Sequence, residues 1–127
     1  IINIFLDDKA LRKQIMSIET DSTPLEDPKN PDTCNAFAIY KLLANEAQIT
    51  TMRANYLGGN YGYGHAKQAL FELIVGKFKT ERERYNYYIN NLTEVDALLK
   101  QGAEKAAGIA NGVLDRVRLK LGFESLQ

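Results

Sequence analysis

The stretch that decides the fold is residues 102–123, GAEKAAGIANGVLDRVRLKLGF. Its apolar residues recur every three or four positions, which is the spacing of one face of an α-helix. These positions are Ala103, Ala106, Ala110, Val113, Val117 and Leu121. The first half of this face is alanine and the second half is valine and leucine. Because small side chains let a neighbouring backbone approach closely, we expect this helix to begin deep against other helices and to diverge from them at its end.

Basic side chains lie beside this apolar face. Lys105, Arg116, Arg118 and Lys120 occupy other sides of the helix, and three of the four fall in its last two turns. Cations at that end interact favourably with the helix dipole. The same side chains could also bind a polyanion. The residues alone leave both interpretations open.

The whole chain has an ordinary globular composition. Of its 127 residues, 25% are charged and 45% are hydrophobic, and the formal net charge is zero, so the total charge points to neither nucleic acid nor membrane. The charge is mildly polarised, because residues 1–61 carry six basic and eight acidic side chains whereas residues 62–90 carry five and three. A single cysteine, Cys34, excludes an internal disulfide and suits a reducing compartment.

The start of the chain and the length of its apolar runs bear on where the protein is located and on whether it is part of a longer protein. No secretory signal occurs, and no apolar run approaches the roughly 20 residues that span a bilayer. The chain begins with IINIFL at Ile1 rather than with methionine, which predicts a piece of a longer protein. We expect one α-helical domain over residues 1–127, located in the cytoplasm and without a membrane partner.

Apolar residues at helical spacing predict about five helices. They cover residues 9–18, about 32–44, 46–57, 64–90 and 102–123, with a short further segment over 93–100. Asp7 or Asp8 and Asn45 are expected N-caps, and Thr93 with Asp96 resembles a capping box. The predicted fold class is therefore all-α, a helical bundle with a long proline-containing loop near the N-terminus.

That loop covers residues 19–32, ETDSTPLEDPKNPD, and contains all three prolines of the chain. Proline removes a backbone donor and fixes φ, so helix is excluded from the middle of this run. Thr20, Asp21 and Ser22 place two hydroxyls and a carboxylate side by side. Long loops are often functional, but such residues also form local turns through side chain to backbone hydrogen bonds, which is the more common case.

A second irregular stretch, YLGGNYGYGH, covers residues 56–65. It lacks the strand and the Gly-Lys-Ser/Thr sequence of a phosphate loop. Its tyrosines could stack on nucleotide bases or, more commonly, pack against the helices that the turn connects. His65 has no acidic partner at catalytic or metal-binding spacing, so we expect a surface or capping residue. Cys34 is expected to be a buried small apolar group.

The predicted helix over residues 64–90 contains a charged run, KFKTERER at residues 77–84. Its cations could meet phosphate or pair with Glu81 and Glu83 within the helix. Gly76 would cost about 1 kcal/mol relative to alanine, which predicts a close neighbour there. No carboxylate pair, metal-ligand cluster or Ser-His-Asp set stands out as a candidate for chemistry, so the residues predict no catalytic site and no metal site.

Three segments in order resemble the C-terminal part of bacterial tryptophanyl-tRNA synthetases. They are residues 15–42, IMSIETDSTPLEDPKNPDTCNAFAIYKL, residues 61–70, YGYGHAKQAL, and residues 102–123. The resemblance covers essentially the whole chain. It implies a class I enzyme that acts as a homodimer, with a Rossmann-type domain for ATP and tryptophan followed by an α-helical domain. The His-Ile-Gly-His-like and Lys-Met-Ser-Lys-Ser-like signatures of that catalytic domain are absent here.

The resemblance implies that the helical domain receives the anticodon of tRNA(Trp). The full-length enzyme would activate tryptophan with ATP and magnesium and charge tRNA(Trp), whereas this chain alone would hold no cofactor and be inactive. Thr20, Asp21 and Ser22 match a loop at the junction with the catalytic domain. The candidate tRNA contacts are Arg82, Arg84 and Tyr85 of the ERY element and Lys105, Arg116, Arg118 and Lys120 of the last helix.

One departure from the family pattern concerns the ERY element. Members often have a proline just before it, where this chain has Lys79 and Thr80, so we expect the helix to run straighter here. Two alternatives to anticodon binding remain open: a structural scaffold for the catalytic domain and its signature loop, and an unrelated helical adaptor that binds partner helices.

Overall fold

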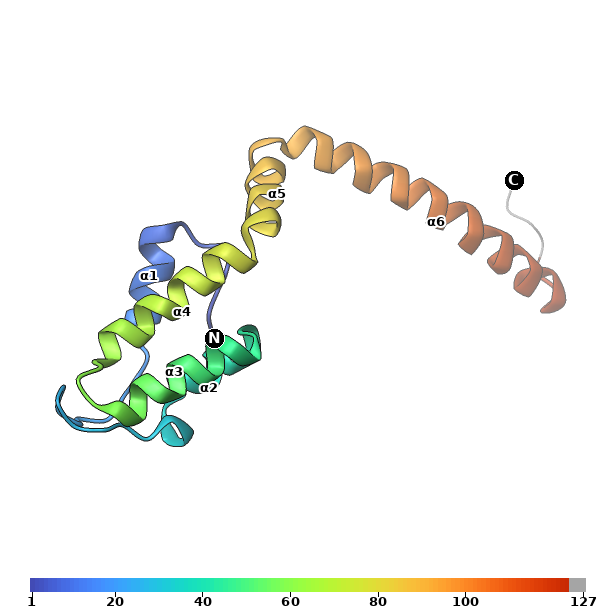
Figure 1. Ribbon diagram of the computed structural model, residues 1–127. Helices are drawn as coiled ribbons and strands as arrows, with labels where there is room; N and C mark the ends of the chain where they lie inside the picture. Colours follow the sequence, from blue (N-terminus) through green and yellow to red (C-terminus); the bar gives the residue numbers. More distant parts are fainter. Residues whose placement is uncertain (124–127) are drawn as a thin grey trace. The chain divides into compact units, whose positions relative to one another are not determined.

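Helix is the only regular secondary structure in residues 1–123, which are the residues that the computed structural model describes. The elements are α1 (Asp8–Met16), the 3₁₀ helix η1 (Pro31–Thr33), α2 (Asn35–Leu43), α3 (Glu46–Gly58), α4 (Tyr63–Lys77), α5 (Lys79–Asn90) and α6 (Leu92–Lys120) (Figure 1). The predicted all-α class is confirmed. Within the same residues, no helix combines the length and the apolarity needed to cross a membrane.

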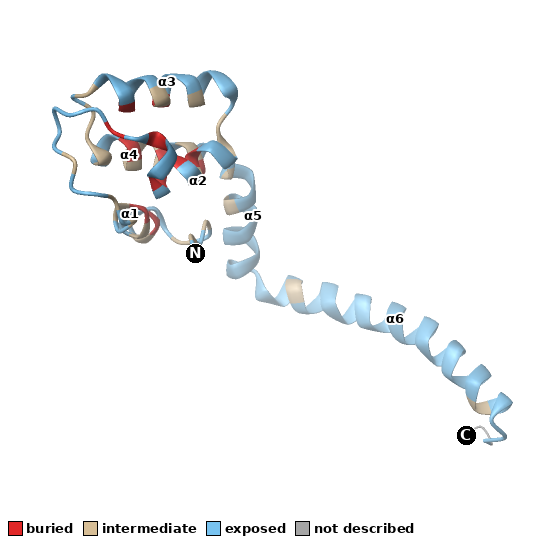
Figure 2. Ribbon diagram, turned by 90° about the horizontal axis from the view of Figure 1, so that it is seen from below, coloured by how far each residue is buried: buried red, intermediate tan, exposed pale blue. Residues whose placement is uncertain are grey.

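The chain divides into two units, Ile1–Glu83 and Arg84–Gln127. In the first unit, α4 packs against both α1 and α2, and the buried residues lie where α1 to α4 face one another (Figure 2). The buried apolar side chains are Leu11, Ile15, Cys34, Ala36, Phe37, Tyr40, Met52, Tyr56, Ala66, Leu70 and Ile74. Cys34 is thus buried, as expected, and its sulfur lies 3.3 Å from the Tyr56 hydroxyl.

Local hydrogen bonds define where two of these helices begin, at the caps that the sequence predicts. Asp7 Oδ1 accepts from the backbone N–H of Ala10 at 2.9 Å and caps α1. Asn45 and Gln48 form a reciprocal capping box at the start of α3, with both bonds at 2.9 Å. Each cap satisfies N–H groups that have no partner within the helix.

The single helix predicted over residues 64–90 is wrong, because the chain bends at Phe78 between α4 and α5. Phe78 has φ −104° and ψ 21° and packs against the core. Four residues later, the Arg82 guanidinium donates to Leu6 O at 2.7 Å and to Asp8 Oδ1 at 2.8 Å. These two attachments explain a bend without proline. The straighter course expected before the ERY element is therefore not observed.

Gly76 also differs from the expectation, since an added Cβ would meet no atom within 4 Å. No close neighbour explains this glycine. It lowers the helix propensity two residues before the bend.

In the second unit, the two helices predicted over 93–100 and 102–123 are one helix, α6. The N-cap is Asn91, so the capping box expected at Thr93 does not form. One internal glycine costs only about 1 kcal/mol, and Gly102 therefore does not end the helix. No residue of α6 is buried, which contradicts the expectation of a helix that begins deep against other helices.

Candidate nucleic-acid interface and junction loop

The loop at Thr20, Asp21 and Ser22, the candidate for the junction with a catalytic domain and called the junction loop below, is held by one carboxylate. Asp21 Oδ1 accepts from the backbone N–H of Thr23 at 2.9 Å and from the Tyr63 hydroxyl at 2.7 Å. The first bond is the local turn that the residue types predict, and the second connects the loop to α4. Hydrogen bonding from Thr23, and then from Tyr63, holds the pKa of Asp21 below its usual value.

Tyr63, in the glycine-rich turn, is the residue that hydrogen-bonds to Asp21 of the junction loop. Desolvation, followed by the hydrogen bond to the Asp21 carboxylate, raises the pKa of Tyr63 to about 12. The hydroxyl therefore stays protonated at neutral pH and remains a donor to Asp21. Tyr61 and Tyr63 both pack their rings near Tyr56, with centroids 5.9 and 6.1 Å away. The turn tyrosines thus connect helices, while His65 is exposed and lies against Tyr61.

A small hollow of about 390 Å³ lies beside this loop. Its lining consists of Glu19, Thr20, Asp21, Thr33, Cys34, Asn35 and Tyr63. Two carboxylates and no cation face it, so its electrostatics disfavour a phosphate. Ser22 does not line it and is exposed. The arrangement does not suit an anion site.

Lys29 is the residue of this region that sequence reasoning missed. Only 2% of it is exposed, and its amine donates to the carbonyl oxygens of Pro24, Leu25 and Asp27 at 2.7, 3.2 and 3.0 Å. The amine also lies 5.5 Å from the centre of the Tyr63 ring. One cation thereby ties together three backbone carbonyls of residues 24–27 in the proline loop. No periodicity in the sequence marks it, because the loop itself creates the site.

The glycine-rich turn packs against the same loop. Gly59 has φ +73°, and a Cβ there would lie 2.5 Å from Glu26 O. The left-handed conformation and the close approach both require glycine. Gly59 therefore lets the loop rest directly on the end of α3.

The three candidates in α5 have different surroundings. The Arg82 side chain is 13% exposed, and its hydrogen bonds to Leu6 and Asp8 attach α5 to the start of the chain. Its low exposure and these contacts make Arg82 a poorer phosphate ligand than an exposed arginine. Arg84 and Tyr85 are exposed and belong to the second unit.

Three of the four candidates in α6 share one side of the helix, which we call the α6 basic edge. Lys105 and Arg116 are eleven positions apart, so at 3.6 residues per turn they differ by only about 20° around the axis. Lys120 lies one turn after Arg116, about 40° further around. All three are exposed. The edge is therefore a row of cations along about four turns.

The charged residues next to this edge lie on other sides of α6, whereas Glu94 shares its side but lies about three turns before Lys105. Arg118 is partly buried and sits about 160° from Arg116. Glu104 and Asp115 each lie about 100° from the cation that follows them. Because no carboxylate interrupts it, the α6 basic edge offers uncompensated positive charge at intervals along the helix. Such a row suits the backbone of a nucleic acid.

Comparisons with known proteins bear on this interface. No family model matches the chain. It is 42% identical over 122 residues to the tryptophan–tRNA ligase of Campylobacter jejuni strain RM1221, which covers 96% of this chain and 38% of that protein. It is also 40% identical over 120 residues to the tryptophan–tRNA ligase of Rhodopirellula baltica, and that match covers 94% of this chain and 38% of that protein.

Solved structures give the same result. The crystal structure of tryptophanyl-tRNA synthetase from Campylobacter jejuni superposes with a TM-score of 0.90 at 42% identity, over 96% of this chain and 40% of that one. A second crystal structure of that protein, complexed with ADP and tryptophan, gives the same score. The chain spans about two fifths of the length of these relatives and corresponds to their C-terminal part. The resemblance seen in the sequence is thereby confirmed.

Proposed function

We propose that this chain, which is homologous over 96% of its length to the C-terminal part of tryptophan–tRNA ligases, is the part of such an enzyme that binds the anticodon region of tRNA(Trp). The observation that carries the proposal is the α6 basic edge of Lys105, Arg116 and Lys120. Its cations are exposed and follow one another along a single side of the helix. Arg84, Tyr85 and Arg118 are further candidate contacts.

The chemistry of charging belongs to the remainder of the enzyme in this proposal. One relative was solved with ADP and tryptophan, and we expect the full-length protein to use ATP with magnesium and to act as a homodimer. The 127-residue chain alone is expected to bind tRNA(Trp) without aminoacylating it.

Binding of labelled tRNA(Trp) to the chain, followed by fluorescence anisotropy, tests the proposal. Each phosphate contact releases counterions, so affinity should fall steeply between 50 and 200 mM salt, a range over which several contacts cost orders of magnitude. Replacing Lys105, Arg116 and Lys120 by glutamine should reduce the slope of log affinity against log salt concentration by about two. The matched control is Lys100→Gln, an exposed cation about 140° around α6 from Lys105. Equal affinity for an unrelated tRNA would remove the claim of specificity.

A scaffold function is the second candidate, and the junction loop favours it. Asp21, Tyr63 and Lys29 hold the loop rigidly without presenting cations to solvent. Asp21→Ala in the intact ligase that contains this segment distinguishes the two. Lost tryptophan activation supports the scaffold, whereas normal activation with lost charging supports tRNA binding.

A further inference from the structure

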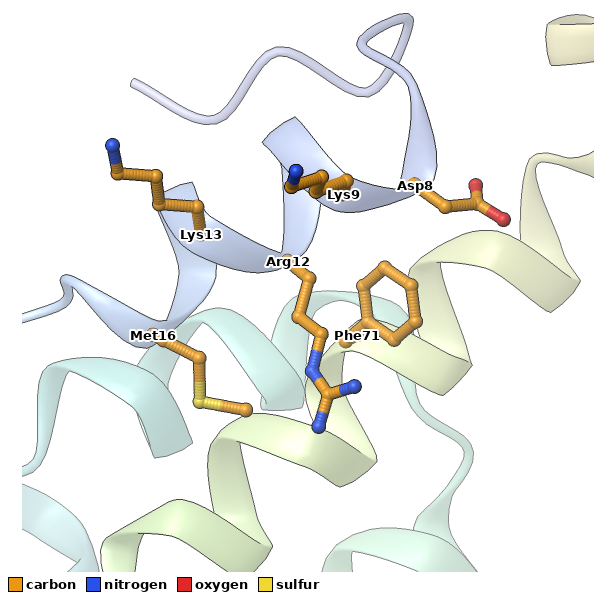
Figure 3. A pocket seen from close by; sticks show the side chains of 6 residues that line it. All are labelled: Asp8, Lys9, Arg12, Lys13, Met16 and Phe71. Carbon is orange, nitrogen blue, oxygen red and sulfur yellow. The ribbon is translucent and has the colours of Figure 1, made fainter.

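The first unit carries a second basic surface, which we call the α1 hollow. It is lined by Asp8, Lys9, Arg12, Lys13 and Met16 of α1 and by Phe71 of α4 (Figure 3). Its volume of about 580 Å³ lies within the range of small-molecule sites, roughly 300–1,000 Å³.

The cations of this hollow differ from most others in the unit because they have no hydrogen-bond or ion-pair partner within residues 1–83. Residues 1–83 contain ten lysines and arginines. Six of them donate a hydrogen bond or join an ion pair: Lys29, Arg53, Lys67, Lys77, Lys79 and Arg82. Of the four cations without such a partner in residues 1–83, three line the α1 hollow, and the fourth, Lys41, lies on α2.

The carboxylates at this end of α1 form no ion pair with these three cations. Asp8 accepts from Arg82 at 2.8 Å, and Asp7 accepts from the backbone N–H of Ala10 at 2.9 Å. In Figure 3 the Asp8 side chain extends away from the basic side chains. The three cations occur at i, i+3 and i+4 and so share one face of the helix, with Cβ atoms roughly 5–6 Å apart. This face therefore presents three positive charges close together, an arrangement that attracts anions.

The floor of the hollow adds an apolar, aromatic element. Phe71 and Met16 are partly buried, and both line the hollow together with Arg12 (Figure 3). Aromatic rings and arginine planes are the surfaces on which unpaired bases stack. A cluster of cations around such a floor matches a ligand that carries both phosphates and flat rings.

We propose that the α1 hollow binds a strand of RNA, with phosphates at Lys9, Arg12 and Lys13 and one base against Phe71. This inference rests on the proposed function, because it supplies a second contact for the same tRNA. The α1 hollow and the α6 basic edge lie in different units of the chain, so each contact can be removed by its own substitutions without touching the other.

The two methionines of the sequence provide a direct readout. Met16 lines the hollow, whereas Met52 is 4% exposed in the core. In the 127-residue chain with ¹³C-labelled methionine methyl groups, added tRNA(Trp) should shift the Met16 signal and leave the Met52 signal in place. Lys9→Gln/Arg12→Gln/Lys13→Gln should abolish that shift, weaken binding about tenfold or more, and lower the log–log salt slope by about two. Lys41→Gln, which removes an unpaired charge elsewhere in the unit, should change binding far less.

Three results would overturn the inference, and they are distinguishable. If tRNA binds through the α6 basic edge while Met16 stays unmoved, the α1 hollow is not a contact and the proposed function stands. If tRNA does not bind at all, both proposals fail together. If polyglutamate, a polyanion without bases, shifts Met16 as much as tRNA does, the hollow recognises charge alone and an acidic protein segment replaces RNA as its ligand. The triple variant keeps its fold, because these side chains have no hydrogen-bond or ion-pair partners among residues 1–83 and glutamine is a good helix former.

Discussion

Lys29→Met tests how the proline loop is held. Methionine keeps an unbranched side chain of similar length but removes the amine that donates to Pro24, Leu25 and Asp27. A hydrogen bond to a charged group contributes roughly 1.5–3 kcal/mol. Burying the ammonium opposes this gain, and the freed carbonyls regain water because residues 24–27 are exposed. We therefore expect a net loss of about 2–4 kcal/mol, a large share of the roughly 5–15 kcal/mol that stabilises a typical domain.

Urea unfolding followed through the Met52 methyl signal measures this loss, since Met52 reports the core of the first unit. A glutamate-specific protease gives a second readout, because Glu26 lies inside the loop and should be cut faster in the variant. Lys41→Met is the matched control, an exposed lysine on α2 without a hydrogen-bond partner among residues 1–83. A loss below about 0.5 kcal/mol with unchanged cleavage would refute the argument that Lys29 organises the loop.

Three further predictions concern the same unit. The pKa of Asp21 is lowered in the folded chain from its usual 3.8. The stability that its carboxylate contributes is therefore present above that pH and is lost as the pH falls through the folded pKa. In urea titrations, Asp21→Asn should lower the free energy of unfolding at pH 7, and the variant and the parent chain should become equally stable in acid. Gly59→Ala should destabilise by more than about 1 kcal/mol in urea, because its φ is +73° and Glu26 O lies 2.5 Å from the added Cβ, whereas Gly58→Ala meets nothing within 4 Å and should not. Leu70→Ala should cost about 2–5 kcal/mol by thermal or urea unfolding at a site that is 0% exposed, while Leu42→Ala, at 81% exposed, should be nearly neutral.

Local signals predicted much of the first unit. Asp7 and Asn45 cap helices through side chains within three residues of their partners, so the sequence contains the whole interaction. The apolar faces of α1, α3 and α4 follow helical periodicity and are the buried ones. The α6 basic edge is equally readable, because its spacing depends only on the geometry of one helix.

The errors arise where distant parts of the chain meet. The bend at Phe78 depends on the core contact of that ring and on the partners of Arg82, neither of which periodicity reports. Lys29 is fixed by a loop whose shape no local rule supplies. In the α1 hollow the spacing of the cations is visible in the sequence, but the position of Phe71 beneath them is not. Gly102 is the opposite case, because a single glycine predicts a helix end but lowers helix stability too little to produce one.

The attachment of Arg82 to Leu6 and Asp8 has a consequence for biosynthesis. These residues are separated by 76 and 74 positions, almost the full length of the first unit. Because a ribosome releases a protein from its N-terminus onward, α1 emerges long before the arginine that anchors its first turn. The apolar side of α1 stays uncovered until α4, against which it packs, has been synthesised, and the Arg82 contacts that anchor the first turn of α1 form only after that.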